Sequence, residues 1–154
     1  MRINAWSDLE RQTRELLAGE SDLIANAANF SALIFHGLAD VNWAGFYFLT
    51  ERGDLLLGPF CGRPACSRLP AGRGVCASAV ARRETVVVDD VARFSDHIVC
   101  DTASRSEIAL PFFVGEALRG VFDCDSPKLA RFTEADRAGL ERLVRAFSQS
   151  VRPR

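Results

Sequence analysis

The sequence has no apolar run long enough to cross a bilayer, so we expect no membrane partner and no membrane-spanning segment. Residues 1–6 lack the apolar region of a signal peptide, which predicts a cytoplasmic protein. There is also no surplus of positive charge: the formal net charge is -1, which argues against a nucleic-acid partner. No linker, internal repeat or low-complexity segment interrupts the 154 residues, so one domain is predicted over 1–154.

Histidine is scarce, and none of the cysteines shows zinc-site spacing. The two histidines, His36 and His97, lie far apart, and the five cysteines include no Cys-x-x-Cys pair. The sequence therefore predicts no metal site. In a reducing compartment, cysteines are more typically thiols or redox groups than structural bridges, and an odd number leaves at least one unpaired.

Helices are predicted at both ends of the chain. Residues 1–37 show helical spacing of apolar side chains, with a capping box at 7–10 and Asp22 capping the second helix. A last helix is expected within 133–152, opened by side-chain capping at Thr133. Between these helical regions the hydrophobic period changes.

Residues 41–125 are predicted to hold the sheet and the site loops. A short helix is expected at 75–82, after an irregular stretch over 61–74 that is rich in glycine and proline. Pro111 predicts a bulge or an unpaired strand edge. The expected strands are 43–49, 55–60, 84–88, 108–114 and 118–124. The order of elements indicates an α+β fold: a central antiparallel sheet with the terminal helices on one face and the active-site loops on the other.

Three cysteines lie in stretches that suit reactivity. Cys100 lies in 97–107, among a histidine, Arg105, hydroxyls and carboxylates, directly before a predicted strand. Cys66 lies in the glycine- and proline-rich loop, and Cys76 lies near a helix N-terminus. A helix N-terminus or a neighbouring cation lowers a thiol pKa, so we expect thiolate character here.

The other two cysteines suit a structural role, because cysteine often fills a core as a small apolar side chain. Cys61 fits this moderately and Cys124 well. Cys124 alternates with Asp123 and Asp125 on a strand, so both acids should face the opposite side. Glu107 begins what should be the adjacent strand. Grouped carboxylates repel, which raises at least one pKa and keeps an acid protonated near neutral pH. A solvated strand end is the alternative interpretation.

The residues alone leave the function open. A redox or nucleophilic role for the three loop cysteines and a purely structural one are equally compatible with the pattern. A hydrolase built on Cys100 and His97 is disfavoured, because loop neighbours three residues apart seldom form a nucleophile–base pair. Trp43 and Tyr47, at even spacing on the first strand, could wall a cavity or pack in the core.

Five motifs occur in order across about residues 42–136, with helices on both sides. They are Asn42-Trp43-x-Gly45-Phe46-Tyr47, Gly58-Pro59-Phe60-x-Gly62-x-Pro64-Ala65-Cys66, Gly72-x-Gly74-Val75-Cys76, His97-Ile98-x-Cys100-Asp101-x-Ala103-Ser104-Arg105-Ser106-Glu107-Ile108 and Asp123-x-Asp125-Ser126. Together they resemble the free methionine-(R)-sulfoxide reductases, single-domain enzymes with the GAF fold.

The resemblance implies thiol-dependent reduction of free L-methionine-(R)-sulfoxide to L-methionine. Cys100 would be the nucleophile and would become a sulfenic acid. Cys66 would then form an intramolecular disulfide with it, while Cys76 could take part in disulfide exchange. Cys61 is close enough in sequence to Cys66 to leave the identity of the resolving thiol open.

The resemblance also implies a substrate pocket. Trp43 and Tyr47 would surround the methyl–sulfur end, with Glu107, Asp123 and Asp125 as polar contacts. An acid must protonate the sulfoxide oxygen, and Glu107 and Asp125 are the candidates. An acidic pocket would also hold the substrate's ammonium group, which a residue inside a polypeptide lacks.

No bound cofactor is implied. Thioredoxin or another dithiol would supply the electrons, and the amphipathic terminal helices together with the family's habit favour a homodimer. The alternative is a non-catalytic GAF module that binds a small molecule or senses redox state, because a fold by itself does not establish function.

Overall fold

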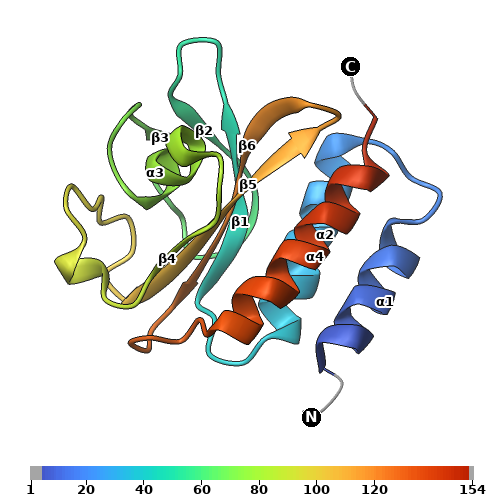
Figure 1. The fold of residues 1–154 in the computed structure, drawn as a ribbon, viewed down its shortest axis with the longest axis horizontal. Coiled ribbons are helices and arrows are strands. Elements are labelled where there is room, and N and C mark those ends of the chain that lie inside the picture. Colours follow the sequence, from blue (N-terminus) through green and yellow to red (C-terminus); the bar gives the residue numbers. More distant parts are fainter. Residues whose placement is uncertain (1–4, 153–154) are drawn as a thin grey trace.

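A computed structural model describes residues 5–152, which form one antiparallel sheet with helices on both faces (Figure 1). The sheet has six strands in the order β3-β2-β1-β6-β5-β4, and each pair of neighbours is antiparallel. The elements are α1 (Ala5–Leu17), α2 (Leu23–Gly37), β1 (Trp43–Leu49), β2 (Leu55–Gly62), β3 (Arg68–Leu69), α3 (Val75–Arg82), β4 (Val86–Val88), the 3-10 turn η1 (Val91–Arg93), β5 (Ser106–Val114), β6 (Ala117–Ser126) and α4 (Glu134–Ser150). The predicted α+β class is confirmed.

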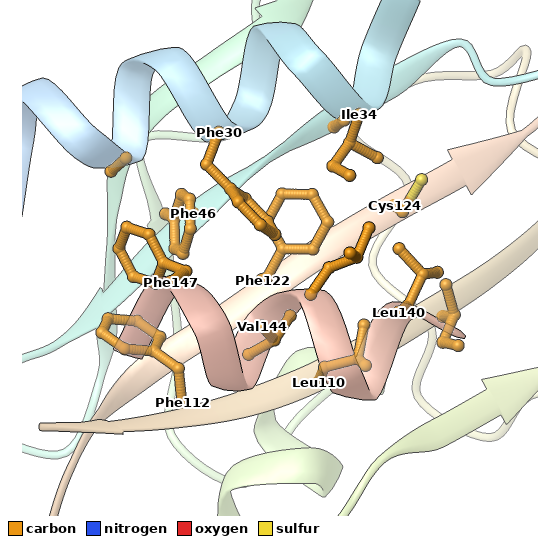
Figure 2. Packing of buried hydrophobic residues seen from close by; sticks show 14 of the residues in the cluster. Phe30, Ile34, Phe46, Leu110, Phe112, Phe122, Cys124, Leu140, Val144 and Phe147 are labelled. Carbon is orange, nitrogen blue, oxygen red and sulfur yellow. The ribbon is translucent and has the colours of Figure 1, made fainter. Parts of the chain in front are cut away.

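The terminal helices cover one face of the sheet, as expected, and α3 with the loops beside it lies on the other (Figure 1). The core between the sheet and the terminal helices is rich in phenylalanine (Figure 2). Phe46 of β1 lies 4.6 Å, between ring centroids, from Phe147 of α4, and Phe30 of α2 lies 4.9 Å from Phe122 of β6. These ring contacts hold α2 and α4 against one face of the sheet. The opposite face of the sheet is therefore available for a functional site.

Two of the three predicted caps are confirmed. The Asp22 side chain accepts a hydrogen bond from the Ala25 N–H, and Thr133 forms a capping box with Asp136. The capping box predicted at 7–10 is wrong, because α1 already begins at Ala5. Trp6 packs so closely on Gly139 of α4 that a Cβ on this glycine would lie 2.2 Å from the indole. Trp6 therefore belongs to α1 and packs against α4, although it precedes the predicted capping box.

Pro111 lies at an unpaired strand edge, one of the two outcomes that its missing N–H predicts. β4 pairs only with residues 107–109 of β5, so Pro111 lies beyond that ladder. The irregularity in β5 occurs later, between Phe112 and Phe113. Within residues 5–152, no helix is long and apolar enough to cross a membrane.

Candidate active site

The register of the sheet brings three acidic side chains together on the face opposite α2 and α4. Glu107 of β5 and Trp43 of β1 both pair with Asp125 of β6. Asp123 lies two residues along β6, on the same side. Glu107 is only 7% exposed and Asp123 only 5%. The alternative of a solvated strand end is therefore wrong. Cys124 points the other way, into the phenylalanine-rich core, as expected.

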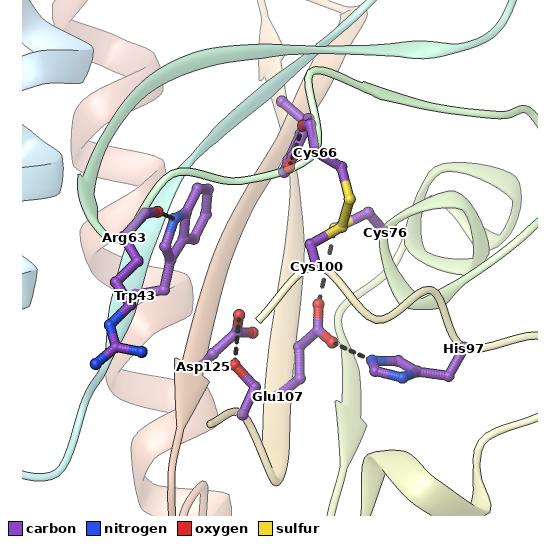
Figure 3. The surroundings of a disulfide bond; sticks show 10 residues. Trp43, Arg63, Cys66, Cys76, His97, Cys100, Glu107 and Asp125 are labelled. Carbon is purple, nitrogen blue, oxygen red and sulfur yellow. Dashed lines mark hydrogen bonds and ion pairs between the residues drawn. A yellow bond between two sulfur atoms is a disulfide. The ribbon is translucent and has the colours of Figure 1, made fainter. Parts of the chain in front are cut away.

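A disulfide joins Cys66 to Cys100 above these acids (Figure 3). The two Cα atoms are 5.4 Å apart, although 34 positions separate the residues in sequence. Cys66 lies between β2 and β3, and Cys100 lies between η1 and β5. The Tyr47 hydroxyl donates to the Cys66 carbonyl over 2.8 Å, and Trp43 Nε1 donates to the Arg63 carbonyl over 3.2 Å. Both aromatic residues therefore anchor the loop of Cys66 to β1.

Cys76 is a buried free thiol at the N-terminus of α3. Its sulfur lies 3.9 Å from Glu107 Oε2 (Figure 3). Burial raises the pKa of the Cys76 thiol well above its ordinary value, and the charges of Asp123, Glu107 and Asp125 raise it further. The expectation of a lowered pKa at this position is therefore wrong. Loss of solvation and three nearby carboxylates outweigh the short helix's dipole.

Cys61 faces away from the disulfide. It pairs with Ala44 across the β1–β2 ladder, so the two side chains share one face of the sheet. Ala44 belongs to the core beneath the terminal helices. This geometry removes Cys61 as a partner for Cys100, an alternative that the sequence had left open.

Asp123 and Asp125 of β6 lie in surroundings that disfavour their charged form. Burial raises the pKa of Asp123 and of Asp125 well above the ordinary carboxyl value. The charges of Asp125 and Glu107 raise the pKa of Asp123 further, and the charge of Glu107 does the same for Asp125. One oxygen of each, Oδ1, is buried and has no hydrogen-bond partner among residues 5–152. The site therefore favours the protonated form of these carboxyl groups and holds two buried oxygens that lack a partner among the described residues.

The loop that carries Cys100 is fastened to the sheet by a polar network. Asn42 Nδ2 donates to Asp101 Oδ2 over 3.2 Å and to Ser104 Oγ over 3.1 Å. The Ser104 hydroxyl donates in turn to Asp125 Oδ2 over 3.3 Å. Sequence reasoning assigned no role to Asn42, Asp101 and Ser104, although all three belong to the motifs. Their common role, to hold the Cys100 loop on the sheet, depends on the loop lying over the end of β1, which only the folded structure shows.

The two basic side chains of the Cys100 stretch, His97 and Arg105, lie in different surroundings. His97 Nε2 lies 3.6 Å from Glu107 Oε1, and both side chains are largely buried (Figure 3). The Arg105 side chain is exposed. Its backbone N–H donates to the Ser126 carbonyl and its own carbonyl accepts from Val91. Arg105 thus anchors the loop through its backbone. Its exposed side chain does not supply the cation that we expected beside Cys100.

The cavity beneath the disulfide has a volume of about 550 Å³, counting its open mouth. It brings together all the predicted site residues except Cys66, which closes it through the disulfide. Sequence reasoning missed Arg73, an exposed basic residue that lines the cavity. The lining residues are Trp43, Tyr47, Ala65, Leu69, Arg73, Gly74, Val75, Cys76, His97, Ile98, Cys100, Asp101, Ser104, Glu107, Asp123 and Asp125.

The Asn42→Ala substitution should lower kcat/KM on the order of 10- to 100-fold, because a catalytic group misplaced by about 1 Å loses that much rate. Removing the amide frees Asp101 and Ser104 and loosens the loop that positions Cys100. Steady-state kinetics with free methionine sulfoxide measure the effect. Asn29→Ala, on the exposed side of α2, is the matched control and should leave the kinetics unchanged. Equal kcat/KM for Asn42→Ala and Asn29→Ala would contradict the role of this network.

Comparison with known proteins agrees with this geometry. Residues 25–152 match the family model for a GAF domain. The chain is 50% identical over 139 residues to the "Free methionine-R-sulfoxide reductase" of Escherichia coli, covering 90% of this chain and 84% of that one. The structure of the free methionine-R-sulfoxide reductase from Neisseria meningitidis, in complex with its substrate, superposes with a TM-score of 0.92 at 39% identity. That match covers 97% of this chain and 91% of the other.

A second substrate complex, that of fRMsr of Staphylococcus aureus, is 41% identical and has a TM-score of 0.90 over 95% of both chains. Such identities over nearly the whole length of each chain establish common ancestry as well as a common fold. The motifs, the disulfide and the acidic cavity occur where the resemblance places them. This chain therefore belongs to the free methionine-(R)-sulfoxide reductase family and has its single GAF domain.

Proposed function

We propose that the protein reduces free L-methionine-(R)-sulfoxide to L-methionine and uses Cys100 and Cys66 as its redox pair. The observation that carries the proposal is the Cys66–Cys100 disulfide, which closes a cavity walled by Trp43 and by buried carboxyl groups. The disulfide is the oxidised end point that such a reaction must reach, and the cavity is where the substrate must lie.

The reaction balances with two thiols. The Cys100 thiolate attacks the sulfoxide sulfur, and a carboxyl group protonates the sulfoxide oxygen. The oxygen passes to Cys100, which becomes a sulfenic acid, and the substrate sulfur, reduced by two electrons, leaves as methionine. The Cys66 thiol then displaces the sulfenic oxygen as water and forms the disulfide. In total, two thiols and one sulfoxide give one disulfide, one thioether and one water.

The proton donor belongs to the acidic cluster. Asp125 suits this role because burial and the charges around it raise its pKa. Asp123 shares that environment and can pass a proton along the cluster. Glu107 contacts His97 and Cys76, so its carboxyl group already has neighbours other than the substrate. Among the two candidates named from the sequence, Asp125 has the better support.

Recognition of the free amino acid follows from the charges on the cavity wall. The ammonium group would lie against the β6 aspartates and Glu107, satisfying oxygens that otherwise lack a partner. The guanidinium of Arg73 offers a contact for the carboxylate. Trp43 would pack on the methyl–sulfur end, and Tyr47, whose pKa is raised by burial, remains a neutral neighbour. A methionine sulfoxide inside a polypeptide lacks both terminal charges.

Recycling requires an external dithiol. We infer that thioredoxin or a related protein reduces the Cys66–Cys100 disulfide by exchange, without a bound cofactor. Such exchange suits the reducing cytoplasm, which is the location that we propose. We also propose the homodimer that the amphipathic terminal helices and the family resemblance favour.

The proposal is tested by steady-state assays of both sulfoxide epimers with a thioredoxin system. The R epimer should be consumed and the S epimer should not. N-acetyl-L-methionine-(R)-sulfoxide, which lacks the ammonium group, should be a poor substrate and is the matched control for recognition. Binding of the R epimer without turnover would overturn the proposal and favour a redox-sensing or small-molecule-binding module.

A further inference from the structure

Three potential metal ligands converge on one wall of the cavity. One atom each of Cys76, Glu107 and Asp123 lies within 4.8 Å of the other two, and all three residues are buried. We propose that this triad binds a divalent cation of intermediate softness, with Zn²⁺ as the best fit. We further propose that the bound ion blocks the substrate cavity. The second statement rests on the proposed function, but the first does not.

The donor atoms are those that zinc prefers. Zinc binds thiolate sulfur at about 2.3 Å and carboxylate oxygen at about 2.0–2.2 Å, which puts a sulfur and an oxygen about 3.6 Å apart on a tetrahedral ion. Cys76 Sγ and Glu107 Oε2 are 3.9 Å apart. The ligand atom of Asp123 lies within 4.8 Å of the other two, so a small rotation of its side chain would bring it to bonding distance. Three protein ligands would leave a fourth position for water.

Unsatisfied oxygens point independently to a missing ligand. Asp123 is only 5% exposed, and its Oδ1 has no hydrogen-bond partner in the described part of the chain; the same is true of Asp125 Oδ1. Buried carboxylate oxygens are normally satisfied, so each such exception requires an explanation. A dication on the triad would satisfy Asp123 Oδ1 and offset the repulsion within the cluster.

His97 supports the same assignment. Its Nε2 lies 3.6 Å from Glu107 Oε1. From this position the imidazole can hold the Glu107 carboxylate in place by a hydrogen bond, or bind the ion itself as a fourth ligand. Imidazole in either position is usual around zinc. The triad comes from α3, β5 and β6. Ligand spacing in the sequence could not show such a site, which is why no metal was predicted there.

The triad is independent of the redox pair. Cys66 and Cys100 are bonded to each other, and neither belongs to the triad, so the disulfide form already carries all three ligands. Binding would release the Cys76 thiol proton to solvent, since zinc takes the thiolate. Mg²⁺ and Ca²⁺ require six or more oxygen ligands and are not expected to bind.

Cobalt(II) is the probe, because a thiolate bound to Co²⁺ gives a charge-transfer band in the near ultraviolet. The oxidised protein should bind one Co²⁺ per chain with this band, and Zn²⁺ should displace it while Mg²⁺ should not. Cys76→Ser should abolish the band, and Asp123→Asn should weaken Co²⁺ binding by at least about tenfold, the usual scale for loss of a metal-site partner. Circular dichroism checks that both variants are folded.

Cys61→Ser is the matched control, because Cys61 lies on the other face of the sheet, and it should retain the band. Absence of the band from the oxidised protein, or its persistence in folded Cys76→Ser, would overturn the proposal. Loss of the band in Cys61→Ser would also overturn it. The spectrum requires no turnover, so an inactive protein that keeps the band would contradict the proposed function alone.

Zn²⁺ should also inhibit competitively against methionine sulfoxide, and chelation should restore the full rate. Mg²⁺ at the same concentration should have no effect. Inhibition that leaves KM unchanged would show that the ion does not occupy the substrate cavity, and would overturn the second part of the proposal.

Discussion

Cys100→Ser is expected to lower turnover of free methionine sulfoxide on the order of 10³-fold or more, the scale on which loss of a catalytic nucleophile acts. A serine hydroxyl is a weak nucleophile at sulfur and cannot pass through a sulfenic acid and a disulfide. The substitution leaves Trp43 and the acidic cluster unchanged, so substrate binding should persist. Steady-state kinetics, with calorimetric titration of the substrate, measure both effects.

The matched control for Cys100→Ser is Cys61→Ser. Cys61 is partly exposed and lies on the opposite face of the sheet, so this variant should keep the rate of the unaltered protein. A Cys100→Ser protein with a tenth or more of that rate would show that another thiol is the nucleophile.

Cys66→Ser should separate chemistry from recycling. A pre-reduced Cys66→Ser protein should form one methionine per chain and then stop, because Cys100 has no thiol with which to condense. The Cys100 sulfenic acid should be trapped by dimedone and identified by mass spectrometry. With thioredoxin as the only reductant, steady-state turnover should fall on the order of 100-fold, since thioredoxin attacks disulfides.

The competing resolver is Cys76, which lines the same cavity as Cys100. Its thiol is buried and its pKa is raised, so little of the reactive thiolate is present. If Cys66→Ser recycles with thioredoxin at the normal rate and the Cys66→Ser, Cys76→Ser double variant does not, Cys76 is the resolving thiol. This result would contradict the assignment of Cys66.

Helix caps and the buried faces of strands were the features that the sequence predicted best. The period of two along 118–124 is a local property, and it was enough to place Cys124 in the core and both neighbouring acids on the other face. The cap signals at Asp22 and Thr133 are equally local. At Ser7 the prediction was wrong: α1 includes Ala5 and Trp6, and Trp6 packs against Gly139 of α4.

Contacts between loops could not be derived from the pattern of residues. Which thiol meets Cys100 depends on how the loop after β2 lies over that before β5, a matter of three-dimensional distance. The pKa of Cys76 rises because the folded chain buries its thiol and places three acids from two strands around it, whereas its local position at a helix N-terminus predicted the reverse. The Asn42 network likewise exists only after the chain has folded. Only the family resemblance pointed to Cys66.

In the proposed reaction, oxidation of the Cys100 and Cys66 thiols to one disulfide reduces one molecule of substrate. Its most direct test is a single turnover of the pre-reduced protein, without external reductant, against each epimer of free methionine sulfoxide. We expect one methionine per chain from the R epimer, none from the S epimer, and one new disulfide that maps to Cys66–Cys100. Methionine formed without this disulfide, or equally from both epimers, would contradict the proposed reaction.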